Sequence, residues 1–280
     1  MEIIKTIDEF LNWRNKKKNS IGFTPTLGAL HNGHLSLIKK STVHCSNTVV
    51  SIFLNPTQFA PIEDLDSYPK TLNADINLLK TLDVNVLFLP NEDEMYNKTP
   101  DVNTPSNNLF NKLEGKSRPR FFYGVTTIVA KLFNVIKPTH TFFGEKDAQQ
   151  LLIIKNMIQE MHYNIKLISC STIRDQNGLA LSSRNQYLNQ AEQKKASIIY
   201  QSLMKIKSEI DKGEKQSKKL KLLFKKEVAA INEIKLDYIS IANVDSLEEI
   251  EIINNRKMLV SAAVYFNNVR LIDNFIYSAT

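Results

Sequence analysis

The first part of the chain alternates between short apolar runs and amphipathic segments. The run NTVVSIFLNP is rich in β-branched residues and stops at Asn-Pro, as a buried strand does. The predicted elements are a strand over 20–25, a helix over 34–45, a strand over 47–56, a helix over 71–83 and a strand over 84–90. Strands that alternate with helices in this way favour a parallel sheet with right-handed crossovers.

The same alternation resumes after a long polar loop. The loop over 97–119 holds three prolines and many asparagines, and its length indicates a working or a mobile loop. A helix begins at Gly124 and ends before Pro138, and its apolar stripe is Val125, Ile128, Val129, Leu132, Phe133 and Ile136. The elements that follow are a strand over 139–144, a helix over 145–161 and a strand over 164–173.

The pattern changes after the turn DQNG at 175–178, where Asn-Gly favours positive φ. Residues 190–232 are helical and rich in lysine, and strand-like runs follow over 236–242, 257–266 and 269–273. Helices followed by strands without strict alternation predict an α+β arrangement. We therefore expect an α/β fold, with a Rossmann-like parallel-sheet domain over 1–174 and a smaller α+β domain over 175–280.

The overall composition excludes few classes of protein, because 42% hydrophobic and 23% charged residues are ordinary for a globular chain of 280 residues. The net charge of +7 is concentrated: eleven lysines and three acids between residues 194 and 226 give +8, so the remainder carries about −1. Nucleic-acid surfaces interleave arginine and aromatic residues with lysine. This segment has no arginine, so we interpret it as a solvated helical face and expect no nucleic-acid partner.

The sequence also predicts where the protein works. It has no run of about 18 apolar residues, so we expect no membrane span. The first twenty residues are acidic and then basic, without the apolar core of a secretory signal. Cys45 and Cys170 are far apart and outside any CxxC pair, which argues against a disulfide framework or a zinc site. A cytoplasmic location is therefore expected.

The segment TPTLGALHNGH, Thr24–His34, lies between a predicted strand and its crossover helix. In an open parallel sheet the carboxyl ends of the strands face the ligand, and a helix N-terminus there suits a phosphate. Gly28 and Gly33 allow close approach of the backbone. His31 and His34, at i and i+3, can face the same way. The spacing matches neither GxGxxG, nor a Walker P-loop, nor the HExxH of zinc hydrolases. In the alternative reading, one histidine caps the turn and the other is exposed.

Three more segments carry candidate ligands for a phosphate or a small acid. NPTQF offers Gln58, although a polar loop residue is the simpler explanation. GEKDAQQ offers Lys146 and Gln150 at a strand-to-helix turn, where the neighbouring acids also complement the helix dipole. LALSSRN offers Ser182, Ser183 and Arg184. These residues form either a phosphate clamp or a serine N-cap next to an exposed arginine. We expect all four segments at one edge of one sheet.

Seven segments, in order over nearly the whole chain, resemble the pantothenate synthetase family: TPTLGALHNGH, VVSIFLNPTQF, EDLDSYPKTLNAD, GVTTIVAKLFN, FFGEKDAQQ, LALSSRNQYL and RLIDN. HxGH alone indicates only the wider nucleotidylyltransferase superfamily. The resemblance implies that ATP and (R)-pantoate give pantoyl adenylate and pyrophosphate. β-Alanine then attacks the adenylate, giving AMP and pantothenate for coenzyme A biosynthesis. The resemblance also implies Mg²⁺ with the ATP, a cytoplasmic homodimer, and a smaller domain that closes over the adenylate.

The resemblance also assigns roles to residues. His31 and His34 lie against the phosphates, with His34 in the proton-donor position, and Lys146 and Arg184 complete the catalytic set. Two glutamines match the positions that hold pantoate, and the first of them borders the β-alanine site: Gln58 and Gln150. The implied ATP-binding residues are Leu27, Gly28, Ala29, Leu30, His31, Asn32, Gly33, His34, Gly144, Glu145, Lys146, Asp147, Ile173, Leu181, Ser182, Ser183 and Arg184.

The chain departs from the family pattern at a few positions. The family usually has Met where this chain has Leu27, a swap close in volume. It usually reads Arg-Pro-Gly-His-Phe where this chain reads Arg-Pro-Arg-Phe-Phe over 118–122, which leaves the role of that loop open. In an acidic helix start often linked to metal only Asp75 matches, so we assign no metal ligand. A nucleotidylyltransferase that forms a dinucleotide is the alternative on the same fold. Gln58 and Gln150 argue against it, because they suit a small hydroxy acid.

Overall fold

The structure, a computed structural model, describes residues 1–60, 63, 65–254 and 257–278. Asp64, within one of the segments that resemble the family, lies outside the described residues. The chain forms two compact units. The first comprises 1–110, 118–145 and 150–171, and the second comprises 111–117, 146–149 and the chain from Thr172 onward. Two short segments, 111–117 and 146–149, therefore group with the C-terminal unit, although the sequence pattern places them in the first domain.

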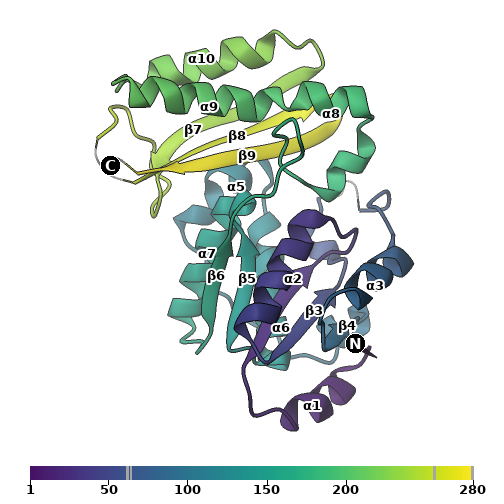
Figure 1. Cartoon of the computed structure of the whole chain (residues 1–280). Coiled ribbons are helices and arrows are strands. Elements are labelled where there is room, and N and C mark those ends of the chain that lie inside the picture. Colours follow the sequence, from purple (N-terminus) through teal and green to yellow (C-terminus); the bar gives the residue numbers. More distant parts are fainter. Residues whose placement is uncertain (61–62, 64, 255–256, 279–280) are drawn as a thin grey trace. The chain divides into compact units, whose positions relative to one another are not determined.

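The first unit is built on a six-stranded parallel sheet, as the alternation of strands and helices predicts. Its strands are β1 (Glu2–Ile4), β2 (Ile21–Thr26), β3 (Asn47–Ile52), β4 (Val86–Phe88), β5 (His140–Gly144) and β6 (Lys166–Cys170) (Figure 1). Their order is β1-β4-β3-β2-β5-β6, and all the pairs are parallel. β2 lies between β3 and β5, so the direction of winding reverses there. Open α/β sheets bind ligands at such a point.

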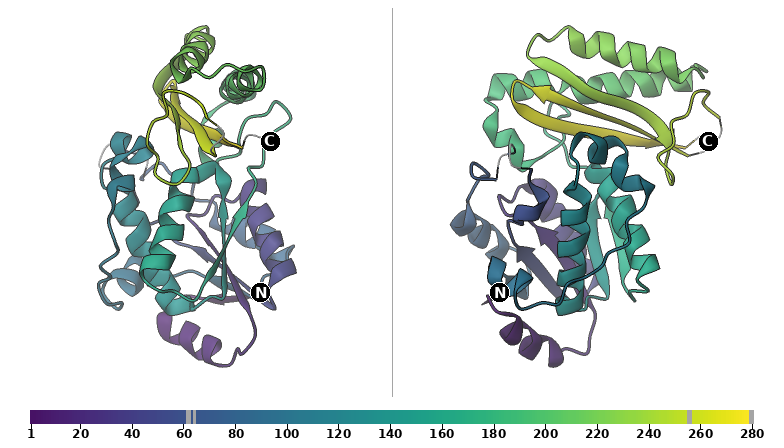
Figure 2. Two further views of the ribbon diagram at one scale, coloured as in Figure 1. Left: turned by 90° about the vertical axis from the view of Figure 1, so that its left-hand side faces the viewer. Right: turned by 180° about the vertical axis from the view of Figure 1, so that it is seen from behind.

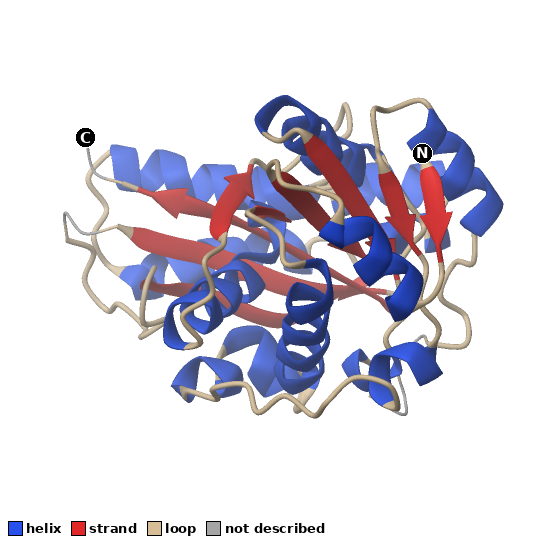
Figure 3. Cartoon of the chain, turned by 90° about the horizontal axis from the view of Figure 1, so that it is seen from below, coloured by secondary structure: helices blue, strands red, loops and turns tan. Residues whose placement is uncertain are grey.

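Helices cover both faces of this sheet. They are α1 (Ile7–Asn15), α2 (Asn32–His44), α3 (Leu72–Lys80), α4 (Glu92–Tyr96), α6 (Phe121–Ile136) and α7 (Ala148–Glu160), with 3-10 turns η1 (Pro56–Gln58), η2 (Asn108–Asn111) and η3 (Glu145–Asp147). α2 lies on one face and α6 on the other (Figures 1 and 2), and Figure 3 shows the strands flanked by helices. The apolar core under α2 and α3 is Leu30, Ile38, Val50, Leu79, Val84 and Leu87.

The second unit is an α+β fold, as predicted. Three antiparallel strands, β7 (Ile234–Asn243), β8 (Met258–Phe266) and β9 (Val269–Tyr277), pack against helices α9 (Ile198–Asp211) and α10 (Ser217–Ala229) (Figure 1). The unit also holds α5 (Leu113–Ser117), the 3-10 turn η4 (Ser183–Tyr187) and α8 (Gln190–Ala196). Its core includes Leu203, Ile206, Phe224, Ile241 and Val260. Both cysteines of the chain, Cys45 and Cys170, are free and buried in the first unit.

Several elements go beyond the sequence prediction or shift its limits. β1 pairs with β4 at the sheet edge, and α1 begins at a capping box formed by Thr6 and Glu9. The loop predicted over 97–119 contains η2 and α5. The helix predicted to begin at His34 begins at Asn32, because His31 is its N-cap. Among the described residues, no helix has the length and apolar character needed to cross a membrane.

Candidate active site

The segment between β2 and α2 turns sharply at the carboxyl edge of the parallel sheet. Gly28 and Ala29 have φ angles of 88° and 50°, so two consecutive residues adopt the left-handed region. Glycine does so without strain, and a Cβ at Gly28 would approach Ile52 Cγ2 to 3.2 Å. The turn ends at His31, the N-cap of α2. Backbone geometry therefore requires this glycine even without a ligand.

Asp75, on α3, holds this turn in place. Its buried carboxylate accepts hydrogen bonds from Ala29 N and Leu30 N, both at 2.9 Å, and from Thr71 Oγ1 at 3.1 Å. Hydrogen bonds from backbone N–H groups to an ionised carboxylate are among the stronger ones in proteins. Asp75 thus fixes the backbone that precedes the two histidines, a role that the sequence pattern did not assign to it.

The described residues do not form a resident Mg²⁺ site. Asp75 uses both carboxylate oxygens to accept N–H groups, and within the described ranges no three His, Cys, Asp or Glu side chains gather around a possible metal position. Proteins commonly bind Mg²⁺ through one or two carboxylates together with water and the phosphates of a substrate. The residues present therefore fit an ion that enters with a nucleotide better than one held by the protein alone.

His31 and His34 stack at the start of α2, with ring centroids 4.1 Å apart. His31 Nδ1 accepts from Gly33 N at 3.1 Å, and His34 Nδ1 accepts from His31 N at 3.4 Å, which completes a capping box. The capping role considered as an alternative is therefore present, and both histidines share it. With Nδ1 accepting, the proton of each neutral ring is assigned to Nε2. Both rings can then donate from Nε2 next to a helix N-terminus, where an anion is favoured.

Gln58, which follows β3, is oriented by a buried asparagine. Asn55 Nδ2 donates to Gln58 Oε1 and to the carbonyl of Gly124, both at 3.2 Å. Asn55 Oδ1 accepts from Tyr96 OH at 2.5 Å, and burial raises the pKa of Tyr96, which keeps this donor protonated. Asn55 is fully buried and Gln58 only 8% exposed. Asn55 is not among the residues predicted from the sequence; its sequence signal is the Asn-Pro pair that opens η1.

The segment GEKDAQQ divides between the two units. Gly144 ends β5 and belongs to the first unit with Gln150, whereas Lys146 belongs to the second. Lys146 Nζ lies 3.7 Å from Asp147 Oδ1, and Asn274 Nδ2 of β9 donates to the Lys146 carbonyl at 2.7 Å. The helix predicted over 145–161 begins as the 3-10 turn η3, so Lys146 precedes α7 rather than lying within it.

Residues 173–184 of the second unit form a closed loop. Leu181 N donates to Ile173 O at 2.9 Å, which joins two of the predicted nucleotide contacts. Ser182 caps η4 by accepting from Arg184 N at 3.3 Å, so the N-cap reading is correct for this serine. This loop lies in the second unit. For LALSSRN, the expectation that all four candidate segments share one edge of one sheet therefore stays a prediction.

The other three segments follow neighbouring strands of the parallel sheet. NPTQF follows β3, TPTLGALHNGH begins in the last residues of β2, and GEKDAQQ begins at the last residue of β5. Gln58, the His31–His34 pair and Gly144 thus lie at the carboxyl edge, where the winding reverses. Amide and imidazole donors beside a helix N-terminus are suited to a phosphate and a small polar acid.

The lysine-rich segment of the second unit is largely balanced by acids. Six of its eleven lysines form ion pairs: Lys195–Glu233, Lys205–Glu227, Lys207–Asp211, Lys212–Glu209, Lys219–Glu214 and Lys221–Glu249. Exposed pairs of this kind suit a solvated helical face.

Known proteins are similar to this chain in sequence and fold over nearly its whole length. A family model described as pantoate-beta-alanine ligase matches residues 2–276. The chain is 42% identical over 279 residues to the pantothenate synthetase of Acetivibrio thermocellus, covering 99% of both chains. It is 40% identical over 276 residues to that of Campylobacter fetus, covering 98% of this chain and 99% of the relative.

Solved structures agree with the sequence match. The fold matches the crystal structure of pantothenate synthetase from Thermus thermophilus with a TM-score of 0.92 and 33% identity, over 98% of this chain and 99% of that one. It matches pantoate-beta-alanine ligase from Francisella tularensis, complexed with beta-gamma ATP and beta-alanine, with a TM-score of 0.79 and 39% identity, over 99% and 97% of the two chains. The chain belongs to the pantoate–β-alanine ligase family.

Proposed function

We propose that this ligase joins (R)-pantoate to β-alanine with ATP, through a pantoyl adenylate, and releases pyrophosphate and AMP. The observation that carries the proposal is the His31–His34 pair, whose Nε2 atoms can donate beside the N-terminus of α2 at the edge where the winding reverses. The Francisella relative, complexed with beta-gamma ATP and beta-alanine, supports ATP and β-alanine as substrates.

In the first step the pantoate carboxylate attacks the α-phosphorus of ATP, and the bond to pyrophosphate breaks. The carboxylate is ionised at neutral pH, so the step needs no general base. It needs in-line placement and neutralisation of charge on the phosphates. We assign placement of pantoate to Gln58 and Gln150, and hydrogen bonding to the phosphates to His31 and His34. His34 is the proton donor in this scheme.

The nucleotide is assigned to Leu27–His34, Gly144–Asp147, Ile173 and Leu181–Arg184. Lys146 and Arg184 supply positive charge, and Ser182 and Ser183 supply hydroxyl donors. Mg²⁺ carried by the phosphates would neutralise further charge, and we assign it no protein ligand.

In the second step the amine of β-alanine attacks the acyl carbon, and AMP leaves. The attacking amine must be neutral, and a desolvated pocket favours that form. Exclusion of water by the second unit, which protects the adenylate, is part of the proposal. A homodimer that works in the cytoplasm completes it.

Exchange of labelled pyrophosphate into ATP tests this function. The purified protein should catalyse exchange only with pantoate present, and should release AMP and pantothenate when β-alanine is added. Exchange without pantoate, absence of exchange with it, or a dinucleotide product by mass spectrometry would each refute the proposal.

A further inference from the structure

Two neighbouring residues of β9 hold two separate parts of the second unit. Asn274 Nδ2 donates to the carbonyl of Lys146 at 2.7 Å. The carboxylate of Asp273 accepts hydrogen bonds from both terminal nitrogens of the Arg174 guanidinium, Nη1 at 2.6 Å and Nη2 at 2.9 Å. Asp273 is 3% exposed and Asn274 8% exposed, so both contacts are shielded from water.

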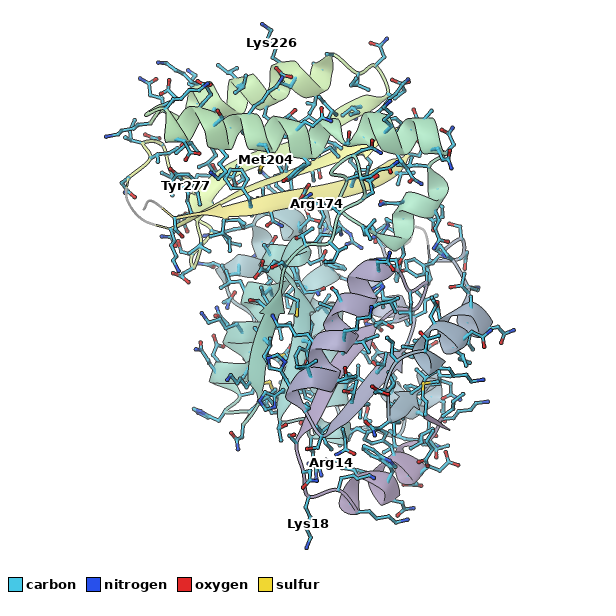
Figure 4. All side chains as sticks on the ribbon, viewed as in Figure 1. Arg14, Lys18, Arg174, Met204, Lys226 and Tyr277 are labelled. Carbon is cyan, nitrogen blue, oxygen red and sulfur yellow. The ribbon has the colours of Figure 1, made fainter. Side chains whose placement is uncertain are left out.

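Arg174 connects β9 to the loop 173–184. The guanidinium also donates to the carbonyl of Gly178 at 3.1 Å and lies over the ring of Tyr200 on α9, 3.9 Å from its centroid. Figure 4 labels Arg174 beside β9. Arg174 pairs with Ala180 in a β-bridge, directly beside the Leu181–Ile173 hydrogen bond that closes the loop. The ion pair with Asp273 therefore ties this loop to β9.

Successive residues of a strand point to opposite faces of its sheet. Asp273 thus reaches one side of β9 and Asn274 the other, and the backbone N–H of Asn274 donates to Asp273 Oδ1 at 2.7 Å. Two adjacent residues of β9 therefore contact both the 3-10 turn that contains Lys146 and the loop that contains Ile173 and Arg184. On the same face as Asn274, Arg270 pairs with Glu114 of α5.

We propose that Asp273 and Asn274 are positioning residues, which set Lys146 and the loop 173–184 in a fixed spacing for the phosphates of the nucleotide. The inference rests on the proposed function for the identity of the ligand. The Asn274 contact is one of the bonds that tie residues 146–149, which follow β5 directly in the chain, to the second unit. Neither residue touches the reacting atoms in this scheme.

The substitution Asn274→Asp tests the proposal with little change in shape. A carboxylate cannot donate to the Lys146 carbonyl and repels it, so the Lys146 turn should move. We expect the KM for ATP in the exchange assay and the Kd of a non-hydrolysable ATP analogue to rise about tenfold, the scale of one lost hydrogen bond. The KM for pantoate should change much less. Amide hydrogen exchange at 146–149 should become faster.

Ser240→Ala is the matched control. Ser240 is also buried in the sheet of the second unit and donates to Glu249 Oε1 at 2.6 Å, but this contact holds none of the proposed ligands. It should lower the Tm without raising the KM for ATP. If Asn274→Asp behaves like this control, the residue is merely structural and the proposal is wrong.

Two further variants and one comparison keep the test decisive. If Asn274→Asp does not fold, Asn274→Ala removes the donor without adding charge, and Arg174→Lys keeps the charge but loses the two-point contact. Either should weaken binding of the ATP analogue, and unchanged binding in both would overturn the inference. If the wild-type protein shows no pantoate-dependent exchange, the proposed function is refuted instead. The Kd of the ATP analogue, measured by calorimetry, would still test the role of Asn274.

Discussion

The carboxylate of Asp75 accepts a hydrogen bond at 2.9 Å from the backbone N–H of Ala29, 46 residues away in sequence. It accepts a second hydrogen bond at the same distance from the backbone N–H of Leu30. Ala29 has a φ of 50°, which costs a residue with a Cβ roughly 1–2 kcal/mol. The crossover helix α3 therefore compensates the strain in the turn that presents His31 and His34.

Asp75→Asn should loosen this turn, because an amide offers one acceptor and places a donor against an N–H group. We expect a loss of about 1–3 kcal/mol in the free energy of unfolding, together with a rise in the KM for ATP. Denaturant unfolding and the exchange assay measure the two effects. Asp83→Asn, at an exposed carboxylate in the turn after α3, is the control. Equal behaviour of both variants would contradict the role of Asp75.

His34 should act through its Nε2 atom and not only as part of the capping box. His34→Ala should lower kcat about 100-fold or more, as loss of one donor to a developing charge does. His34→Asn keeps an acceptor for the His31 N–H and should lose activity equally, while unfolding close to the wild-type midpoint. Full activity in His34→Asn would mean that capping alone matters. His44→Asn, at the exposed end of the same helix, serves as the control.

Periodicity located all the strands of both sheets except β1. Buried parallel strands are continuous apolar runs, such as VVSI in β3, and these are visible without any tertiary information. β1 has only three residues, two of them exposed, so it offers no run to detect. Helix α1 carried a usable signal, since Thr6 and Glu9 have the spacing of a capping box.

Only part of the candidate site could be predicted from the sequence pattern. Strand ends and helix starts pointed to His31, His34 and Gln58, because a parallel sheet gathers its carboxyl ends at one edge. Other contacts of the site join residues that are distant in sequence: Asn55 and Gly124 are 69 residues apart, and Lys146 and Asn274 are 128 apart. Local patterns carry no information on such pairs. For the same reason, the assignment of 146–149 to the second unit was not visible in the sequence.

Arg120 precedes α6 with a φ of 71° and an exposed side chain. Arg120→Gly should stabilise the fold by about 0.5–1 kcal/mol, because relief of left-handed strain exceeds the entropy that glycine adds to the unfolded chain. Lys70→Gly, at an exposed position without positive φ, should not stabilise it. Denaturant midpoints compare the two, and a lower midpoint for Arg120→Gly would show that the arginine side chain makes a compensating contact.

His140, at the start of β5, should make stability depend on pH. Burial, Lys166 and His44 lower its pKa below the ordinary 6.5. The unfolded chain then takes up a proton first on acidification, so stability is complete above 6.5 and falls as the pH drops toward the folded-state pKa. His140→Gln should flatten this part of the profile, whereas His162→Asn, at an exposed histidine, should not. Unfolding midpoints between about pH 7.5 and 5 provide the measurement, and parallel profiles for wild type and His140→Gln would contradict the prediction.

Gly124 allows α6 to approach η1 more closely than any other residue could. A Cβ at this position would lie 2.3 Å from the carbonyl oxygen of Thr57, so the backbone next to Gln58 would have to move. Gly124→Ala should cost about 1–3 kcal/mol of stability. It should also raise the KM for pantoate more than that for ATP, because the Asn55 contact that orients Gln58 includes the Gly124 carbonyl.

Gly144 provides a matched comparison for the stability part of this prediction. A Cβ there meets no atom within 4 Å, so Gly144→Ala should unfold at the wild-type denaturant concentration or above it. If both alanine variants unfold at the same midpoint, close approach at Gly124 does not limit the fold. If Gly124→Ala is destabilised while the KM for pantoate stays constant, the packing argument holds but Gln58 does not depend on α6 for its position. The two measurements therefore separate the packing of α6 from its contribution to substrate binding.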